Sequence, residues 1–590
     1  MTIVAGLMSR NGRPIPKGLR DALISVMSRN PHDSVRTYGG DHWLIAKIDI
    51  GALGSEACFA TPGGPAFVLA GEMLVRNKGF DTCLDREVES KVVFEELCNG
   101  EVSSLQCVSG QFCAAMFLPA DHRLILVSDK LGLRPVYYTV NREIAAFASA
   151  LRVLEALGLG TEELDLRGAY EASTFGYPLN SRTCYTYIRT IAPAEVVHIT
   201  RDAETHARYF RWDKLEPRQS HEDSLVPELV HAFEDGVKRR RRGDKHTVSF
   251  LSGGLDSRAI VAALRKQEVT VYSVNFAPPG SQDRAFGALA AGVLGSIHHL
   301  LDVPGSASRD SYRKQQLKAW IETTSSLDPK PERPHCIWSG DGGSVALGHV
   351  YVDQHAARAF DDGDLEEGIQ AFLRCNRISG GGNSAMTPAF RNQCQGWHIN
   401  GIREEIESLR RKLDSRSLHL FLMLNDQRRH LTDHFEKIDV DRFEFHLPFF
   451  DSHFLELILR EPVSPFLRHA FYHKWIRALS PSAASVPWQV YPTHEPCPIP
   501  SDGQLRYQWG DYYGRREDRR IARSTALRAL GDVFAANLPS HLIRRTRYGA
   551  AVLLSLAGVT NLGHVIRTGN VFSRCWRISQ RRSSERETWQ

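Results

Sequence analysis

The chain has 590 residues, which is too long for a single hydrophobic core and predicts at least two domains. Hydrophobic residues make up 42% of the chain and charged residues 24%, as in ordinary globular proteins, and the formal net charge is only +5. So small a charge excess gives no reason to expect nucleic-acid binding.

The termini and the cysteines predict a cytoplasmic protein. Residues 1–12 lack a basic region followed by a long apolar run, so they do not read as a signal peptide. The most apolar late stretch, residues 548–566, is interrupted by Thr560, Asn561 and His564, which favours a buried helix over a membrane span. The eleven cysteines are scattered and form no CxxC pair, as is typical of free thiols in a reducing compartment.

The first part of the chain, residues 1–212, reads as β-rich. Short apolar segments bounded by Gly, Pro or Asp predict strands, and residues 128–140 predict a turn that enters a further strand. The four predicted strands are residues 42–50, 65–73, 112–118 and 123–129. Residues 87–100 predict one helix that ends at Gly100.

The pattern changes in the second part, residues 220–590. A helix over 225–242, whose basic end Lys238 to Arg242 is typical of a charged helix terminus, precedes a strand over 246–251. A Gly-rich turn, a helix over 258–267 and a strand over 269–276 follow, and this order predicts a parallel sheet flanked by helices. Later segments are mainly helical. The Arg-rich part from about Asp502 is predicted to extend this helical half.

The segment SGGLDS, Ser252 to Ser257, lies between the buried strand and the helix. Gly253 and Gly254 are expected to take positive φ and to admit an anion, and the N-terminus of the next helix favours negative charge. The two serines add hydroxyl donors. Asp256 fits beside phosphates if it holds Mg²⁺. The turn matches neither GxxxxGK[ST], since no Lys occurs in it, nor the Rossmann fingerprint.

These residues resemble the pyrophosphate loop of adenylating ATP-pyrophosphatases. More narrowly, they resemble the asparagine synthetase B-type family, which includes β-lactam synthetases and lasso-peptide macrolactam cyclases. Four further segments carry the resemblance. Residues 110–138 are similar to the family's G-x-F and D-x-x-G-x-R-P-x-Y-Y signatures, and residues 273–299, with Asp283, to the strand that lines adenine and its helix. SGDGGS (339–344) is similar to SGEGxDE, and HLPFFD (446–451) to R-x-PFLD.

The resemblance implies an α+β, glutaminase-like N-terminal domain of Ntn-hydrolase type over residues 1–212. It implies an α/β synthetase domain over residues 220–590, with a parallel sheet flanked by helices, and ATP and Mg²⁺ as cofactors. By residue-by-residue match, the nucleotide-binding positions are Leu251, Ser252, Gly253, Gly254, Leu255, Asp256, Ser257, Val274, Asn275, Phe276, Ser339 and Gly340. The metal ligands implied are Asp256 and Asp341.

The N-terminal part departs from the family. Glutamine-dependent members have a Cys nucleophile at position 2, where this chain has Thr2. A threonine could in principle be activated by its own α-amine. However, HRGPD is absent, and AGEMLV (70–75) stands in place of NGEIYN. We therefore expect no glutaminase activity, and a domain kept for packing or substrate support.

The synthetase part departs too. Ser344 stands where the family has an acidic metal ligand, so Asp341 or a water would have to replace it. The family's R-x-K lysine, a stabiliser of pyrophosphate, has no match, and Lys474 or Arg477 could supply the charge. Residues 487–498 are the corresponding stretch. Its cluster of Trp488, Tyr491, His494 and Glu495 reads either as a rigid Pro-ordered loop or as an acceptor-binding wall in which His494 or Glu495 takes a proton from the amine.

With the ammonia source lost, the acceptor amine is expected to come from the substrate. The first hypothesis is a ligase that forms an isopeptide or macrolactam within one peptide, releasing AMP and pyrophosphate. Such a peptide has a free N-terminal amine and an Asp or Glu side chain. The expected partners are a leader-peptide-binding protein and a cysteine-protease-like maturation enzyme. The alternatives are a small-molecule amide synthetase of asparagine or β-lactam type, and a degenerate nucleotide-binding scaffold.

Overall fold

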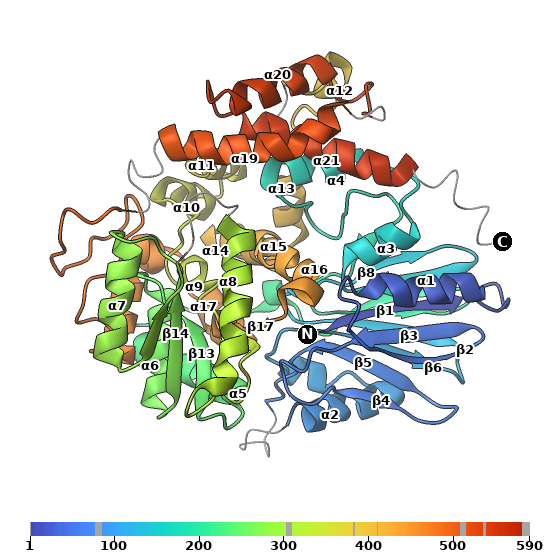
Figure 1. The fold of residues 1–590 in the computed structure, drawn as a ribbon, viewed down its shortest axis with the longest axis horizontal. Coiled ribbons are helices and arrows are strands. Elements are labelled where there is room, and N and C mark those ends of the chain that lie inside the picture. The colour runs from blue at the N-terminus through green and yellow to red at the C-terminus, as the bar shows by residue number, and fades with distance from the viewer. Residues whose placement is uncertain are drawn as a thin grey trace.

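The computed structural model shows two β-sheet bodies side by side, with a layer of helices across one end of both (Figure 1). The residues that it describes are 2–76, 85–302, 309–380, 384–409, 411–507, 515–534 and 538–580.

Two six-stranded antiparallel sheets stack face to face in the N-terminal part, which confirms the predicted β-rich body. The first has the order β10-β8-β9-β1-β3-β2 and the second β12-β11-β7-β6-β5-β4. The strands are β1 (Ile3–Ser9), β2 (Val35–Gly40), β3 (Trp43–Ile48), β4 (Cys58–Ala60), β5 (Ala66–Gly71), β6 (Phe112–Leu118), β7 (Arg123–Ser128), β8 (Tyr137–Val140), β9 (Ile144–Ala148), β10 (Arg189–Thr190), β11 (Glu195–Ile199) and β12 (Glu204–Arg208).

Helices cover both outer faces of this sandwich and give it four layers. α1 (Lys17–Met27) and α3 (Leu151–Leu157) pack on the first sheet, and α2 (Arg86–Cys98) packs on the second. Every residue of β1, β5 and β6 is buried, because each of these strands is covered on both faces. As predicted, α2 is followed by Gly100, which has φ of 78°.

The second body is a five-stranded, fully parallel sheet of order β15-β14-β13-β16-β17, as the strand–helix–strand pattern predicted. Its strands are β13 (His246–Phe250), β14 (Thr270–Asn275), β15 (Ile297–Leu300), β16 (Cys336–Trp338) and β17 (Glu444–His446). One face carries α5 (Glu222–Arg241), α6 (Asp256–Lys266), α7 (Gln282–Leu294), α17 (Ser452–Arg460) and α18 (Ala470–Leu479). The other face carries α8 (Arg309–Thr323) and α16 (Thr432–Asp441).

Most of the remaining helices form the upper part of the molecule, while α9, α14 and α15 lie lower, near the parallel sheet (Figure 1). They are α4 (Leu166–Phe175), α9 (Gly343–Ala346), α10 (Gln354–Asp361), α11 (Leu365–Cys375), α12 (Pro388–Gln393), α13 (Trp397–Ser408), α14 (Ser415–Phe421), a π-helix (Leu422–Gln427), α15 (Arg428–His430), α19 (Arg515–Phe534), α20 (Arg545–Leu556) and α21 (Gly563–Gln580). Short 3₁₀ turns occur at Ser104–Cys107, Trp212–Lys214, Thr324–Ser326, Pro448–Phe450 and Ser464–His469.

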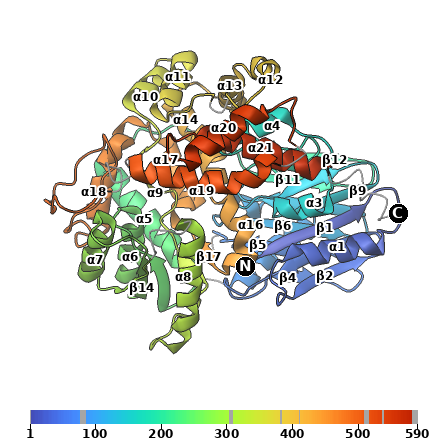
Figure 2. The same cartoon turned by 45° about the horizontal axis from the view of Figure 1, so that its top comes forward.

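The three C-terminal helices pack together and onto α4 of the N-terminal body (Figure 2). Their shared core contains Tyr170 of α4 together with Tyr548 and Phe572. The predicted single helix over 548–566 is wrong, because the chain leaves α20 after Leu556 and starts α21 only at Gly563. None of the helices in the described ranges is both long enough and apolar enough to cross a membrane.

Buried ion pairs join the two bodies. Arg134, from the GLRP segment, pairs with Glu444 of β17, and both side chains are almost fully buried. Glu72 lies 3.4 Å from Arg242 and 3.5 Å from His446. His446 belongs to the same strand, β17, as Glu444. Since a buried charge is tolerated only when it is paired, these contacts fix the N-terminal body against the edge of the parallel sheet.

Candidate functional site

The SGGLDS segment forms the turn between β13 and α6, at the carboxyl end of the parallel sheet, where ligands of open α/β sheets usually bind. Asp256 is the first residue of α6, two residues earlier than the sequence predicted. A pocket opens over this turn. It is lined by Ser252, Gly254, Leu255, Asp256, Asp283, Ser344, His469, His473, Trp488, Gln489, Val490, Tyr491 and Glu495.

Hydrogen bonds within the turn hold its donors in place. The Ser252 N–H donates to Ser257 Oγ (2.9 Å), the two hydroxyls lie 3.0 Å apart, and the Gly254 N–H donates to Ser252 Oγ (3.2 Å). The Gly253 N–H donates to the carboxylate of Asp283. The carboxylate of Asp283 therefore already accepts a hydrogen bond from this turn, as expected of a turn that can bind an anion.

The expectation that Gly253 and Gly254 take positive φ is wrong, since neither does. Glycine is required at 253 for another reason: a Cβ there would lie 2.8 Å from the Cα of Asp283. A second loop, residues 339–344, also packs closely against the first loop, residues 252–257, because a Cβ at Gly343 would lie 2.7 Å from the carboxylate of Asp256. Close approach of backbones, and not an unusual backbone conformation, selects these glycines.

Asp256 is held by three donors. Tyr472 OH donates to one carboxylate oxygen (2.6 Å), and both the backbone N–H (3.1 Å) and the hydroxyl (2.7 Å) of Ser344 donate to the other. Burial raises the pKa of Asp256 to about 6, although these hydrogen bonds favour the ionised form. Tyr472 was not predicted; the available signal was its place in the first turn of α18, between His469, which precedes the helix, and His473.

Asp341 lies in the second loop, but its two oxygens are engaged elsewhere. His430 Nε2 lies 3.0 Å from Oδ1, and Ser339 Oγ donates to Oδ2 at 2.5 Å. Burial alone would raise the pKa of Asp341, but the hydrogen bonds from His430 and Ser339 hold it below its ordinary value. Gly340 of the same loop packs on the first loop, since a Cβ there would lie 2.8 Å from the Ser257 nitrogen.

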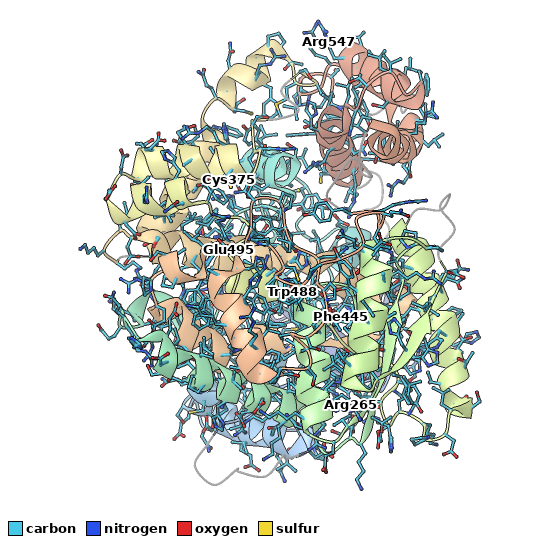
Figure 3. The ribbon with its side chains drawn as sticks, turned by 90° about the vertical axis from the view of Figure 1, so that its left-hand side faces the viewer. Arg265, Cys375, Phe445, Trp488, Glu495 and Arg547 are labelled. Atoms are coloured by element: carbon cyan, nitrogen blue, oxygen red, sulfur yellow. The ribbon has the colours of Figure 1, made fainter. Side chains whose placement is uncertain are left out.

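The segment after Pro487 covers the turn. The Gln489 N–H donates to the Gly253 carbonyl at 2.9 Å, and Trp488 is only 2% exposed. Arg258, buried in α6, anchors this segment by donating to the carbonyls of Ala483, Val486 and Pro487. Trp488 and Glu495 are labelled in Figure 3. The Pro-rich stretch therefore packs against α6 and also lines the pocket, while acceptor binding by this stretch stays a prediction.

His494 contacts His469, which lines the pocket. The two Nδ1 atoms lie 2.7 Å apart, and His469 Nε2 lies 3.3 Å from Ser344 Oγ. The His469 ring stacks between Tyr472 and Tyr491, at centroid distances of 5.5 and 5.4 Å. Burial and nearby Arg468 lower the pKa of His494 to about 4, so its imidazole is neutral at physiological pH.

Lys474 does not reach the pocket. It lies on the outer side of α18, where its ammonium pairs with Glu222 of α5 and both side chains are exposed. Arg477 is exposed on the same helix. Within the described parts of the chain, no Lys or Arg lines the pocket, so neither candidate supplies positive charge there in this conformation.

The predicted adenine strand is next to the turn. β14 pairs with β13, Val274 opposite Phe250, and the Asn275 side chain donates to the Leu251 carbonyl at 2.8 Å. Phe276 meets the Phe250 ring edge to face, at a centroid distance of 5.8 Å. These contacts bring the two predicted nucleotide-binding segments together.

Comparisons with known proteins agree with this layout. Residues 228–327 match the Asparagine synthase family, and residues 69–210 match the Glutamine amidotransferase domain family. Asparagine synthetase [glutamine-hydrolyzing] 1 of Bacillus subtilis is 29% identical over 189 residues, 32% of this chain and 30% of that protein. Asparagine synthetase [glutamine-hydrolyzing] 3 of the same organism is 25% identical over 266 residues, 42% of each chain. These matches support the asparagine synthetase family.

More distant matches have other names or lower similarity. Amidase chry2 of Gibberella zeae is 21% identical over 334 residues, 51% of this chain and 49% of that protein. Each of these alignments covers less than two thirds of the relative's own length. A solved structure of the allosteric regulatory enzyme of purine biosynthesis covers 51% of this chain and 80% of its own, with 12% identity and a TM-score of 0.25, which is too low to support an argument.

The N-terminal position of this asparagine synthetase-like chain is enclosed. Thr2 is 2% exposed, and its hydroxyl donates to Asp49 at 3.3 Å. Asp49 is also 3.0 Å from Lys47 and 3.4 Å from Arg86, both of which are buried. Glu72, in the segment that departs from the family's glutamine-binding motif, is committed to the interface between the two bodies.

Replacing Thr2 by Ala should therefore leave ATP-dependent activity unchanged, and neither protein should hydrolyse glutamine. The reason is that Thr2 lacks a thiol and its surroundings are filled by charged side chains of the protein. Glutamate release from glutamine is the measurement. Glutamate formed by the wild type and lost in Thr2→Ala would show a working glutaminase instead.

Replacing Ser252 by Ala should weaken the apparent affinity for ATP about tenfold or more. The hydroxyl that accepts from the Gly254 N–H and meets Ser257 is lost, while the backbone of the turn remains. One hydrogen bond to a charged group is worth roughly 1.5–3 kcal/mol. The KM for ATP is the measurement, with the exposed Ser326→Ala as matched control; equal KM values in both variants would exclude Ser252 from the site.

Proposed function

We propose that this protein uses ATP to activate a carboxylate as an acyl-adenylate, releasing pyrophosphate, and then transfers the acyl group to an amine, releasing AMP. The observation that supports this best is the Ser252–Ser257 turn, at the carboxyl end of a parallel sheet and at the N-terminus of α6, with Asp256 inside the same pocket. The relatives named asparagine synthetase point to the same class of amide-forming, ATP-dependent chemistry.

The turn would bind the polyphosphate. Its backbone N–H groups and the hydroxyls of Ser252 and Ser257 surround the start of α6, where the helix dipole also favours anions. Asp283 must release the Gly253 N–H when a phosphate oxygen takes that place. Val274, Asn275 and Phe276 of the neighbouring strand, with Leu251, Leu255, Ser339 and Gly340, are proposed to complete the nucleotide site.

Mg²⁺ fits this donor set through Asp256. Magnesium in nucleotide sites is usually held by one or two carboxylates together with phosphate oxygens, and Asp256 lies beside the turn that would cradle them. When bound, the cation would screen the repulsion between carboxylate and polyphosphate and stabilise the charge of the departing pyrophosphate. Asp341, bonded to His430 and Ser339, would keep the second loop against the first.

The attacking amine has to lose a proton. Glu495 lines the pocket, and neutral His494 lies behind it, bonded to His469. Either group could accept the proton as the amine attacks the adenylate carbonyl. The rigid wall formed by residues 488–495 would hold the acceptor in place, which is what a bimolecular step needs to become effectively unimolecular.

The substrate that fits best is a peptide whose own N-terminal amine attacks an activated Asp or Glu side chain. The support is the combination of an intact ATP turn with an N-terminal body whose Thr2 and Glu72 are committed to internal contacts. A macrolactam ring of the lasso type would result. A leader-peptide-binding protein and a cysteine-protease-like maturation enzyme are the partners we propose for such a peptide.

Mass spectrometry tests this function directly. Incubation with ATP, Mg²⁺ and the processed peptide encoded beside this protein should give AMP and a product lighter by one water that resists aminopeptidase. Amino-acid substrates should give no AMP. AMP formed only with a free amino acid would favour a small-molecule amide synthetase, and no pyrophosphate with any substrate would favour a nucleotide-binding scaffold.

A further inference from the structure

The pocket over the turn has an unusual charge for a polyphosphate site. Three carboxylates, those of Asp256, Asp283 and Glu495, are among the side chains that line it. The described lining includes two histidines, His469 and His473, but neither lysine nor arginine. Burial lowers the pKa of both histidines, so they bring no charge at neutral pH. A bare polyphosphate would therefore meet mainly like charge.

The protein alone offers little to hold a cation there. Considering the described residues, no three His, Cys, Asp or Glu side chains are grouped so that they could bind a metal ion. The carboxylates around the turn have partners of their own, and Glu495 lies 3.6 Å from Arg468. Asp256 accepts from Tyr472 and Ser344, Asp283 accepts from the Gly253 N–H, and Asp341 is bonded to His430 and Ser339.

Ser344 completes the hydrogen bonding of the Asp256 carboxylate. Its side chain is almost buried, with 8% of the residue exposed, and its hydroxyl lies between Asp256 (2.7 Å) and His469 Nε2 (3.3 Å). Since the hydroxyl hydrogen goes to the carboxylate, His469 donates to Ser344 from Nε2, and its Nδ1 then accepts from His494. Every link in this chain is a neutral donor directed towards Asp256, so hydrogen bonds from the protein already occupy the carboxylate oxygens without a cation.

We propose that, because position 344 is a serine, the free protein binds no divalent cation. The cation enters the site only as a complex with the polyphosphate. Asp256 alone then meets a cation whose other ligands are phosphate oxygens and water. A carboxylate at position 344 would reverse this order, because two adjacent acids would hold the cation before the nucleotide arrives. This inference rests on the proposed function.

The experiment is a titration of the purified full-length protein with Mn²⁺, followed by electron paramagnetic resonance of the free ion. Without nucleotide, wild-type protein should bind Mn²⁺ more weakly than about 1 mM. Adding α,β-methylene-ATP should give one bound Mn²⁺ per chain. Ser344→Asp should bind Mn²⁺ at least about tenfold more tightly than wild type without nucleotide, since it adds a second carboxylate beside Asp256.

Ser344→Asn is the matched control, because it has the size of the aspartate variant but no charge and should gain no Mn²⁺ affinity. Ser326→Asp adds an exposed carboxylate elsewhere and should also gain none. One Mn²⁺ bound tightly to the nucleotide-free wild type would overturn the inference, as would equal affinity in Ser344→Asp and Ser344→Asn. If the aspartate variant does not fold, the nucleotide-free wild-type titration still decides. Failure of the nucleotide analogue to bind at all would count against the proposed function instead.

Discussion

Asp256→Asn should lower the rate of ATP-dependent pyrophosphate release by more than about a thousandfold. The carboxylate accepts from Tyr472 OH, from the Ser344 N–H and from the Ser344 hydroxyl. An amide has only one acceptor oxygen, so its NH₂ group must face another donor. It also loses the charge that attracts a cation. Charge-assisted hydrogen bonds are worth roughly 1.5–3 kcal/mol each, and about 4 kcal/mol is a thousandfold in rate.

The same substitution should leave the melting temperature almost unchanged. Burial raises the pKa of Asp256 to about 6, so the ionised carboxylate is less favourable in the folded protein than in the unfolded chain. For an acid whose pKa is raised on folding, ionisation at neutral pH lowers stability. A neutral amide relieves that cost, which offsets the hydrogen bonds that the amide loses. A residue that is present although it lowers the stability of the fold is typical of a functional site.

Pyrophosphate release and a thermal melt of the same preparation measure both effects. Asp121→Asn is the matched control, because this aspartate is exposed and pairs with Arg123 in the N-terminal body. It should change neither value. Near wild-type pyrophosphate release by Asp256→Asn, with the metal still required, would remove Asp256 from the site.

The sequence was sufficient to predict the elements that local patterns determine. Short apolar segments bounded by Gly, Pro or Asp predicted β3, β5, β6 and β7, and the Gly-rich turn between a buried strand and a helix predicted the start of α6 to within two residues. The same pattern indicated the anion-binding turn, because strand, turn and helix are neighbours in the chain. The turn of this pocket is therefore readable from six consecutive residues.

Its walls are not. Tyr472 lies 216 residues beyond Asp256 and Ser344 lies 88 residues beyond it, so no local pattern relates them. From the sequence, Ser344 was only a missing acid; its hydrogen bond to Asp256 depends on how the second loop packs on the first. The glycine prediction failed for the same reason, since the atoms that exclude a side chain at Gly253 belong to Asp283, thirty residues away.

The C-terminal helices show a different limit. The apolar run over 548–566 suggested one buried helix, but it is shared between α20 and α21. Its buried residues, such as Tyr548, Val552 and Ile566, share a core with α19 and α4, while Leu553, Leu554 and Val559 are exposed. Helical periodicity cannot report which partners a segment will meet. The eleven cysteines were predicted to be free thiols. The ten in the described ranges are free, and Cys83 lies outside those ranges.

Asp451→Ala should lower the free energy of unfolding by about 4 kcal/mol or more. Arg240 and Asp451 have fully buried side chains that pair at 2.8 Å, and Arg240 also donates to Gln111 of the N-terminal body. Removing the carboxylate leaves a buried guanidinium without its counter-ion, which typically costs about 3–5 kcal/mol. Asp451 also caps α17 by accepting from the His453 and Phe454 N–H groups, and losing a cap costs about 1 kcal/mol.

The midpoint of urea unfolding measures this loss, and two variants separate its causes. Asp451→Asn keeps an acceptor for the helix N–H groups, so it should lose only the charge contribution and fall between the wild type and Asp451→Ala. Lys91→Ala removes an exposed pair with Glu95 at 4.0 Å and should change stability by less than about 1 kcal/mol. A loss in Asp451→Ala no larger than in Lys91→Ala would mean that Arg240 finds water or another partner, and that this buried pair adds little to the stability of the fold.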